Sequence, residues 1–513
     1  SGLARLGFIP ATGAGVAVVN RVAMGAVNVS ALAAIELKTG IPEELRTLVV
    51  IPTLLTSPAS IEELVSRLEM HYLASRDGDV YFALLTDWTD AAAESRDGDA
   101  ELRDVALEGI ARLNRTHGPA AGGNRFTLFH RRRMWNESEG KGIGWESKRG
   151  KLHELNRILR GAAETSVIAL QGQHLPMNVR YVVTLDSDTR LPHEAVRRLV
   201  GKLAHPLNQP KFDPAVGRVV GGYAILQPRV TPSLPAGRRS TIFQRVFSSP
   251  NGIDPYTAAV SDLYQDMFAE GSFAGKGIYE IDAFEAALAG RVPESTLLSH
   301  DLFEGVFARA GLVTDIEVIE EFPTDYLVAA SRQHRWVRGD WQLLPWIFPW
   351  VCRIRGVAMS GSPMTGIARW KMMDNLRRSL SAPMAVLALF AGWFLNFHDA
   401  TVWSLFIVST IALPSLLPLL GDIIPRRQWV NFHSYAAILL DDLRRTVVTT
   451  LLCLVFLADQ ACLMGDAIIR TLGRVFITRR NLLQWTTAAQ ASEASRPEIE
   501  GYYRQMVGTT VIG

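Results

Sequence analysis

The chain has 513 residues, enough for more than one domain, and its formal net charge of +2 provides no overall field for binding nucleic acid. Its three cysteines, Cys352, Cys453 and Cys462, have no paired metal-ligand spacing, and their odd number argues against a disulfide framework. We therefore expect a reducing compartment for the soluble part. The chain begins without a secretion signal, and we expect a fragment of a longer protein.

The N-terminal 331 residues predict a short helical segment and then one α/β domain. Within residues 1–45, the weakly apolar stretch 11–34 contains Arg21 and predicts a packed or interfacial helix rather than a membrane span. Over 46–331 the predicted strands are 47–55, 80–87, 125–132, 179–188, 218–228 and 313–322. The predicted helices between the first four strands are 59–76, 100–116 and 147–161. This alternation predicts a mostly parallel sheet with helices on both faces.

Polar side chains stand where several predicted strands end, which is the edge at which such sheets bind ligands. They are Thr53, Asp87, Asp186 and Asp188. In VTLDSDTRLP, Asp186 and Asp188 are two residues apart, so an extended strand would point both carboxylates to the same side. Two carboxylates together with substrate phosphates suit Mg²⁺ or Mn²⁺. The alternative is a helix cap at Asp188 or at the threonine that follows it.

Two charged residues at predicted helix starts are candidates for catalysis. Lys148 opens the helix in WESKRGKLHELN, where a cation opposes the helix dipole, so it either neutralises a diphosphate or belongs to a solvated basic face. Asp301 in LSHDLFEGVF is either a helix cap or a general base. The loop GSFAGKG, which includes Gly275 and Lys276, would let the backbone approach a ligand closely.

The C-terminal third predicts membrane association. Residues 332–380 mix arginine with tryptophan and predict interfacial helices, with a buried amphipathic helix as the alternative. The uncharged runs 379–397 and 400–421 predict a transmembrane hairpin over 381–421 whose flanking arginines place both ends in the cytoplasm. A third membrane-associated run containing Asp459 lies within 422–480, with its topology open, and 481–513 is expected to be a linker.

Four motifs in this order resemble processive membrane glycosyltransferases of the cellulose-synthase type, which have the Rossmann-like GT-A fold. The matches are Asp87, Asp186-Ser187-Asp188, Ser299-His300-Asp301 and Arg332-Gln333-His334-Arg335-Trp336. Two positions depart from the pattern, because His300 replaces the glutamate of T-E-D and Arg332 stands where glutamine is usual. Longer stretches, such as EGSFAGKGIYEIDAFE and QHRWVRGDWQLLPW, resemble the glycosyltransferase region of bacterial cyclic β-1,2-glucan synthases over nearly the whole chain.

The resemblance implies inverting transfer of glucose from UDP-glucose to the 2-hydroxyl of a growing β-1,2-glucan, with Mg²⁺ or Mn²⁺ as cofactor. The implied donor-site residues are Thr53 and Asp87 for uridine, Lys148 and Arg335 for the diphosphate, and Asp188 for the metal, with Asp186 near the metal or the sugar. Asp301 would be the base. The implied acceptor-binding residues are Trp336, Gly275 and Lys276.

The same resemblance implies a multi-pass protein of the bacterial inner membrane with a cytoplasmic catalytic domain. Its implied partners are the lipid bilayer and the phosphorylase-like and cyclising regions of a longer polypeptide, with no nucleic acid. Members of the family are thought to build the glucan on their own tyrosine, for which Tyr256, and then Tyr264, are the candidates. The residues leave open a related synthase of another linkage and a weakened domain that binds nucleotide sugar as a scaffold.

Overall fold

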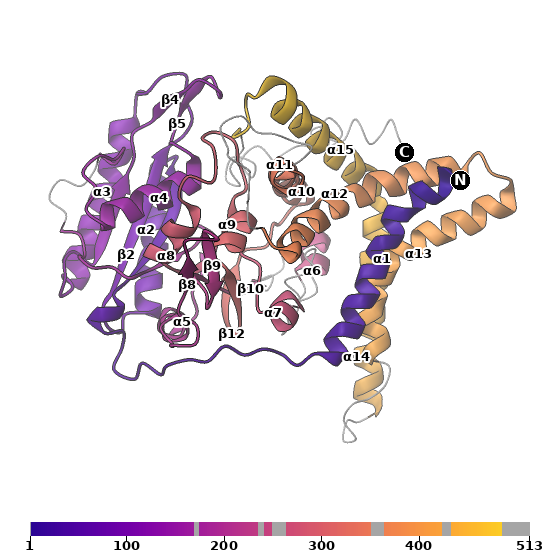
Figure 1. Ribbon diagram of the computed structural model, residues 1–513, viewed down its shortest axis with the longest axis horizontal. Helices are drawn as coiled ribbons and strands as arrows, with labels where there is room; N and C mark the ends of the chain where they lie inside the picture. Colours follow the sequence, from indigo (N-terminus) through magenta and orange to yellow (C-terminus); the bar gives the residue numbers. More distant parts are fainter. Residues whose placement is uncertain are drawn as a thin grey trace.

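The computed structural model describes residues 2–168, 174–233, 241–248, 263–349, 364–422 and 432–484. Figure 1 shows an α/β domain at one end of the molecule and three long helices, α1, α13 and α14, at the other. A group of helices that includes α10 and α12 lies between them.

One eight-stranded sheet forms the centre of the α/β domain. Its strands, in spatial order, are β3 (Phe126–His130), β2 (Val80–Trp88), β1 (Thr47–Leu55), β6 (Tyr181–Thr184), β11 (Gly277–Glu280), β10 (Ile225–Pro232), β12 (Ala310–Glu320) and β7 (Thr189–Arg190). The pairs β3–β2, β2–β1, β1–β6 and β10–β12 are parallel, whereas β11 is antiparallel to both neighbours and β7 is antiparallel to β12. The predicted α/β fold with a mostly parallel sheet is confirmed.

Helices cover both faces of this sheet because its strands are apolar on both sides. In β1, Val49 and Ile51 pack into one core, and Leu48 and Val50 pack into the other, as the two-residue period of a strand requires. The first core is covered by α2 (Pro58–Ala74), α3 (Asp99–His117) and α5 (Ala195–Leu203). The second is covered by α4 (Ser147–Leu159), α8 (Ile281–Leu288), α9 (Asp301–Phe307) and α11 (Leu344–Ile347).

Smaller elements complete the domain. They are the 3₁₀ turn Glu43–Leu45, the hairpins β4 (Met134–Asn136) with β5 (Lys141–Ile143) and β8 (Lys211–Asp213) with β9 (Arg218–Gly221), and the short helices α6 (Ile242–Phe247) and α7 (Leu263–Phe268).

Helix α10 (Tyr326–Gln342) joins the domain to the helical part. It packs on α12 (Gly366–Gly392) and α15 (Leu457–Gly473), and Val337 is buried between these helices. Trp341 donates a hydrogen bond of 2.9 Å to Ser379 Oγ. Residues 332–342 of the segment predicted to be interfacial therefore pack on two other helices through Val337 and Trp341, and their interfacial placement stays a prediction.

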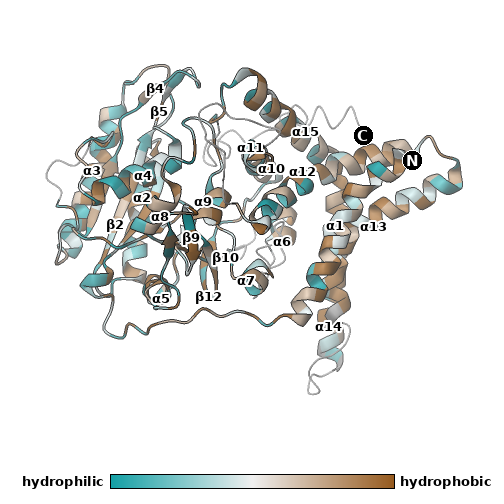
Figure 2. Cartoon of the chain, in the orientation of Figure 1, coloured by the Kyte–Doolittle hydropathy of each residue, from teal (hydrophilic) through white to brown (hydrophobic). Residues whose placement is uncertain are grey.

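Two described helices are long and apolar enough to cross a membrane, Gly2–Ala26 (α1) and Phe397–Leu420 within α13 (Phe397–Asp422). Apolar residues predominate along α13 (Figure 2). A third crossing is possible if the bent pair α14 (Phe432–Val455) and α15, which meet at 55° and continue into the π-helical turn Arg474–Thr478, is one span.

This set of helices differs from the predicted hairpin in two ways. The apolar part of α12 ends at Gly392 rather than at residue 397, so it is shorter than the roughly 20 residues that cross a bilayer. Residues 2–26, for which a packed or interfacial helix was expected, form a helix of spanning length that packs on α12 and α13. Gly7 is so close to Trp403 there that a Cβ at this position would lie 2.7 Å from the indole. The single arginine at position 21 does not end the helix.

Candidate active site

Asp186 lies between two lysines that come from different elements. Lys148, in the first turn of α4, donates a 2.6 Å hydrogen bond to its Oδ1, and Lys276, directly before β11, lies 3.1 Å from its Oδ2. Burial alone would raise the pKa of Asp186, but the two ammonium groups lower it well below its usual value. Lys148 is therefore part of this site and not of a solvated basic face, and Asp186 is held as a carboxylate.

Asp188 is paired with an arginine and does not cap a helix. Arg332 of α10 donates a 2.9 Å hydrogen bond to Asp188 Oδ2. The backbone after Asp188 forms β7, and α5 begins only at Ala195 with Glu194 as its N-cap residue. The helix-cap alternative is therefore wrong, and the carboxylate of Asp188 faces the site.

Glu320 adds a third carboxylate that the sequence motifs did not indicate. It lies at the end of β12 and accepts a 2.6 Å hydrogen bond from Lys276, while Arg332 lies 3.5 Å from its other oxygen. Burial would lower the pKa of Lys276, but Asp186 and Glu320 raise it, so the ammonium group stays charged. The sequence signal that could have found Glu320 is its position as the last residue of a strand. Asp87 is similar, because it lies one residue before the end of β2.

The glycine loop touches Asp301. A Cβ at Gly275 would lie 2.7 Å from Asp301 Oδ1, and the φ angle of Gly275 is +77°, so glycine is required for two reasons. The carbonyl of Gly275 also accepts a 2.9 Å hydrogen bond from Lys148. Asp301, Lys148 and Asp186 are thereby brought to the same place in the fold.

Arg335 and Trp336 lie one turn after Arg332 on α10. Burial lowers the pKa of Arg335, and the carboxylates of Asp186, Asp301 and Asp188 act against that effect. The guanidinium is thus within the electrostatic reach of all three carboxylates. The side chain of Trp336 is 51% exposed and is accessible to a ligand.

Asp87 lies in a buried ion network next to this site. Arg131 binds it through two hydrogen bonds of 2.8 Å, and Lys151 lies 3.3 Å from its Oδ2. Arg131 also donates to Glu154 at 2.8 Å, and Lys151 donates to the backbone carbonyl of Thr53. Burial would raise the pKa of Asp87, but Arg131 and Lys151 lower it. The predicted residues Asp87 and Thr53 are thus connected, but through side chains that are buried.

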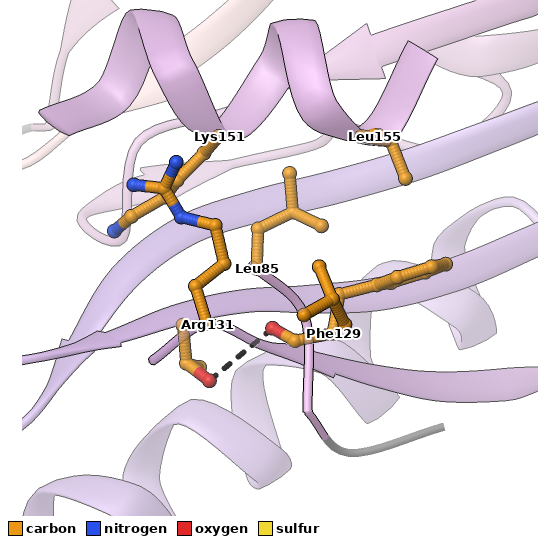
Figure 3. A pocket seen from close by; sticks show the side chains of 7 residues that line it. Leu85, Phe129, Arg131, Lys151 and Leu155 are labelled. Carbon is orange, nitrogen blue, oxygen red and sulfur yellow. Dashed lines mark hydrogen bonds between the residues drawn. The ribbon is translucent and has the colours of Figure 1, made fainter. Parts of the chain in front are cut away.

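A small cavity lies beside the two basic side chains of this network. It has a volume of about 10 Å³ and is lined by Leu85, Phe129, Arg131, Lys151 and Leu155 among others (Figure 3). Such a volume accommodates about one water molecule and no nucleotide. Any ring that binds near Asp87 therefore has to lie outside this cavity.

The structure describes one of the two tyrosines predicted as glucan attachment points. Tyr264 lies in α7, where the ammonium group of Lys371 stands 4.9 Å from the centre of its ring. Tyr256 is outside the residues that the structure describes.

Comparison with known proteins relates the chain to part of a much longer synthase. No protein-family profile matches the chain. Over 479 residues, 93% of the chain, it is 48% identical to the cyclic β-(1,2)-glucan synthase NdvB of Rhizobium meliloti (strain 1021). The predicted resemblance is confirmed. The chain spans 16% of that relative's length.

A solved structure similar to the chain is a mannosyltransferase from Pyrobaculum calidifontis in complex with GDP-Man and Mn²⁺. The TM-score is 0.41 and the sequence identity 14%, and the match covers 81% of this chain and 96% of that one.

The carboxylates of the site are donors of the kind that a divalent cation takes, but they are not gathered as ligands of one ion. Among the described residues, the three ligand atoms that lie within 4.8 Å of one another belong to His300, Asp301 and Glu304. Asp186, Asp188 and Glu320 offer only oxygen ligands, which Mg²⁺ prefers. In this structure the three carboxylates are shared among Lys148, Lys276 and Arg332, so a cation would have to displace some of these contacts. The carboxylates suit a metal by their chemistry, and they are charge-balanced without one.

Proposed function

We propose that this chain is a membrane-bound glucosyltransferase that moves glucose from UDP-glucose to the 2-hydroxyl of a growing β-1,2-glucan, with inversion at the anomeric carbon. The observation that carries the proposal is the convergence of Asp186, Asp188 and Asp301 with four cations, in a chain similar along its length to part of a cyclic β-(1,2)-glucan synthase. The four cations are Lys148, Lys276, Arg332 and Arg335.

The cations would bind the diphosphate of the donor. Lys148 and Arg335 come from α4 and α10, so they would approach the two phosphates from different elements. Positive charge fixed in this way stabilises the negative charge that develops on departing UDP. Thr53 and Asp87 would line the side toward the uridine, with Asp87 acting mainly by holding Arg131 and Lys151 in place.

A divalent metal, Mg²⁺ or Mn²⁺, would be held by Asp188, with Asp186 beside it. Bound there, it would neutralise the diphosphate and act as a Lewis acid on the leaving group. Glu320 would keep Lys276 and Arg332 at the site after they leave the aspartates, because it contacts both. The same two cations would then be available to the phosphate oxygens.

Asp301 would take the proton from the acceptor hydroxyl. The hydroxyl oxygen would attack the anomeric carbon from the face opposite UDP, which inverts the configuration in one displacement. The exposed indole of Trp336 would stack against the acceptor glucose, and the loop at Gly275 and Lys276 would border the path to it.

The surroundings that we propose are those of the family. The chain would be anchored by several helices in a bacterial inner membrane with the site facing the cytoplasm. It would act together with phosphorylase-like and cyclising regions of a longer polypeptide. Tyr256 and Tyr264 stay candidates for glucan attachment, and peptide mapping of glucosylated protein tests them.

The proposal is tested by incubating the membrane-embedded chain with radiolabelled UDP-glucose and Mg²⁺ or Mn²⁺ and determining the linkage of the product. A 1,2-linked glucan is expected. The matched variant Asp301→Asn should lower kcat by about 10²–10⁴-fold, the usual contribution of a general base, while UDP binding measured by calorimetry is unchanged. A product of another linkage would identify a related synthase, and UDP binding without any transfer would identify a scaffold.

A further inference from the structure

His300 and Glu304 form a buried pair next to Asp301. They stand one helical turn apart, and their side chains are 7% and 3% exposed, whereas that of Asp301 is 29% exposed. His300 Nδ1 lies 2.8 Å from Glu304 Oε1 and 3.6 Å from Asp301 Oδ1. The imidazole is thus placed between a fully enclosed carboxylate and the carboxylate that reaches the site.

We propose that His300, held by Glu304, is a positioning residue that keeps the carboxylate of Asp301 directed toward the acceptor hydroxyl. This inference rests on the function proposed above, because it needs Asp301 as the base. It gives a role to the histidine that departs from the T-E-D pattern at position 300 and to the glutamate four residues later.

An ordinary structural role does not account for His300. Its side chain makes no cap hydrogen bond to α9. The charged groups that act on it are Glu304 and Asp301 of α9 and, more weakly, Lys148 of α4. Burial alone would lower the pKa of His300, but the two carboxylates raise it, against a smaller opposing effect of Lys148. The two carboxylates therefore favour the charged form of the imidazole.

The unpartnered atoms of this cluster point to a ligand that binds here. Asp301 Oδ1 and Glu304 Oε2 are buried and have no hydrogen-bond partner among the described residues. For Asp301 Oδ1, the acceptor hydroxyl of the glucan is a donor of the right kind. Its O–H bond would break, its proton would pass to Asp301, and its oxygen would form the new bond to the anomeric carbon as the bond to UDP breaks. His300 would keep its proton throughout.

The test is the pH profile of kcat/KM for the full chain in membranes. His300→Gln removes the imidazole that faces Asp301 and its positive charge, so the acid limb should move to higher pH by about one unit or more. UDP binding should not change. The matched control is His153→Gln, which removes a second His–Glu pair, 2.7 Å to Glu285, that links α4 to α8. Its profile should match that of the unmodified chain.

A second variant distinguishes positioning by charge from mere structural support. Glu304→Gln takes away the carboxylate that holds His300 and favours its charged form, so the acid limb should move in the same direction as in His300→Gln, and by less. Shifts of the same sign in the two variants support the proposal, and equal losses without a shift overturn it. Loss of Mn²⁺ binding in His300→Gln would overturn it too, because the cluster would then be a metal site. If the unmodified chain transfers no glucose, the proposed function fails and not this inference alone.

Discussion

Arg332 donates a 2.9 Å hydrogen bond to Asp188, so the carboxylate proposed to bind the metal is already paired with a guanidinium. Glutamine would be expected at this position from the resemblance to cellulose-type synthases. The arginine therefore adds a positive charge where a divalent cation has to approach, and it also provides a further donor for the diphosphate.

Replacing Arg332 with glutamine should strengthen binding of the metal alone. Without the competing charge, Mn²⁺ affinity should rise about tenfold, which corresponds to about 1.4 kcal/mol. Titration of free Mn²⁺ by electron paramagnetic resonance measures it directly, without turnover. The control is Arg190→Gln, since Arg190 binds Glu321 close by and not Asp188. Equal affinities in the unmodified chain and Arg332→Gln would show that Asp188 is not a ligand.

Gly275→Ala should impair transfer far more than it destabilises the fold. The new Cβ would lie 2.7 Å from Asp301 Oδ1 and push the carboxylate out of place, so kcat should fall about 100-fold, as for comparable misplacement of a reacting group. Gly290→Ala is the matched control, because Gly290 has a similar φ of +67° but nothing within 4 Å of its Cβ position. Both variants should lose about 1 kcal/mol of stability from backbone strain. Similar activities in the two variants would contradict the placement of Asp301.

Asp87→Asn should destabilise the domain. It leaves Arg131 and Lys151 buried with one carboxylate partner fewer, and loss of one member of a buried ion network costs about 3–5 kcal/mol. Asp282→Asn is the control, because its partner Arg160 lies at the surface and the exposed pair contributes about 1 kcal/mol at most. Thermal unfolding followed by circular dichroism measures both. If Asp87→Asn unfolds at the same temperature as the unmodified chain but binds UDP weakly, Asp87 contacts the nucleotide directly.

The same network should make stability depend on pH in the alkaline range. Burial lowers the pKa of Lys151 from 10.5 to about 8. Between these two values the unfolded chain binds more protons at this site than the folded chain does, so the contribution of Lys151 to the free energy of unfolding rises with pH there. Urea denaturation at pH 7.5 and 9.5 should therefore show a gain for the unmodified chain relative to Lys151→Met. A constant difference between the two proteins at both pH values would count against it.

Strands that lie in the sheet with both faces covered could be predicted because they are continuous apolar runs. The range 47–55 coincides with β1, and 80–87 falls one residue short of β2. The strand β11 was missed because it has only four residues and follows a glycine loop, which hides it from any periodicity. The predicted run to residue 188 was too long, because β6 ends at Thr184 and the backbone turns before the two aspartates.

The candidate site was predictable to the extent that its residues follow strands or begin helices. Lys148 binds Asp186 and is within the electrostatic reach of Asp301, and the roles of these three residues stay proposals. Glu320 and Arg131 were not predicted. Charged residues are common where strands end, so these two could not be singled out as site residues before the neighbouring strands were known. Burial of Asp87 could not be foreseen either, since it depends on Arg131 from β3 and Lys151 from α4.

The site has equal numbers of positively and negatively charged side chains, and this equality has a consequence for how metal and nucleotide bind. The four cations Lys148, Lys276, Arg332 and Arg335 face the four carboxylates Asp186, Asp188, Glu320 and Asp301. A divalent ion alone, or a nucleotide diphosphate alone, would upset this balance, whereas the two together nearly preserve it. We therefore expect metal and nucleotide to bind cooperatively, each raising the affinity for the other by the same factor.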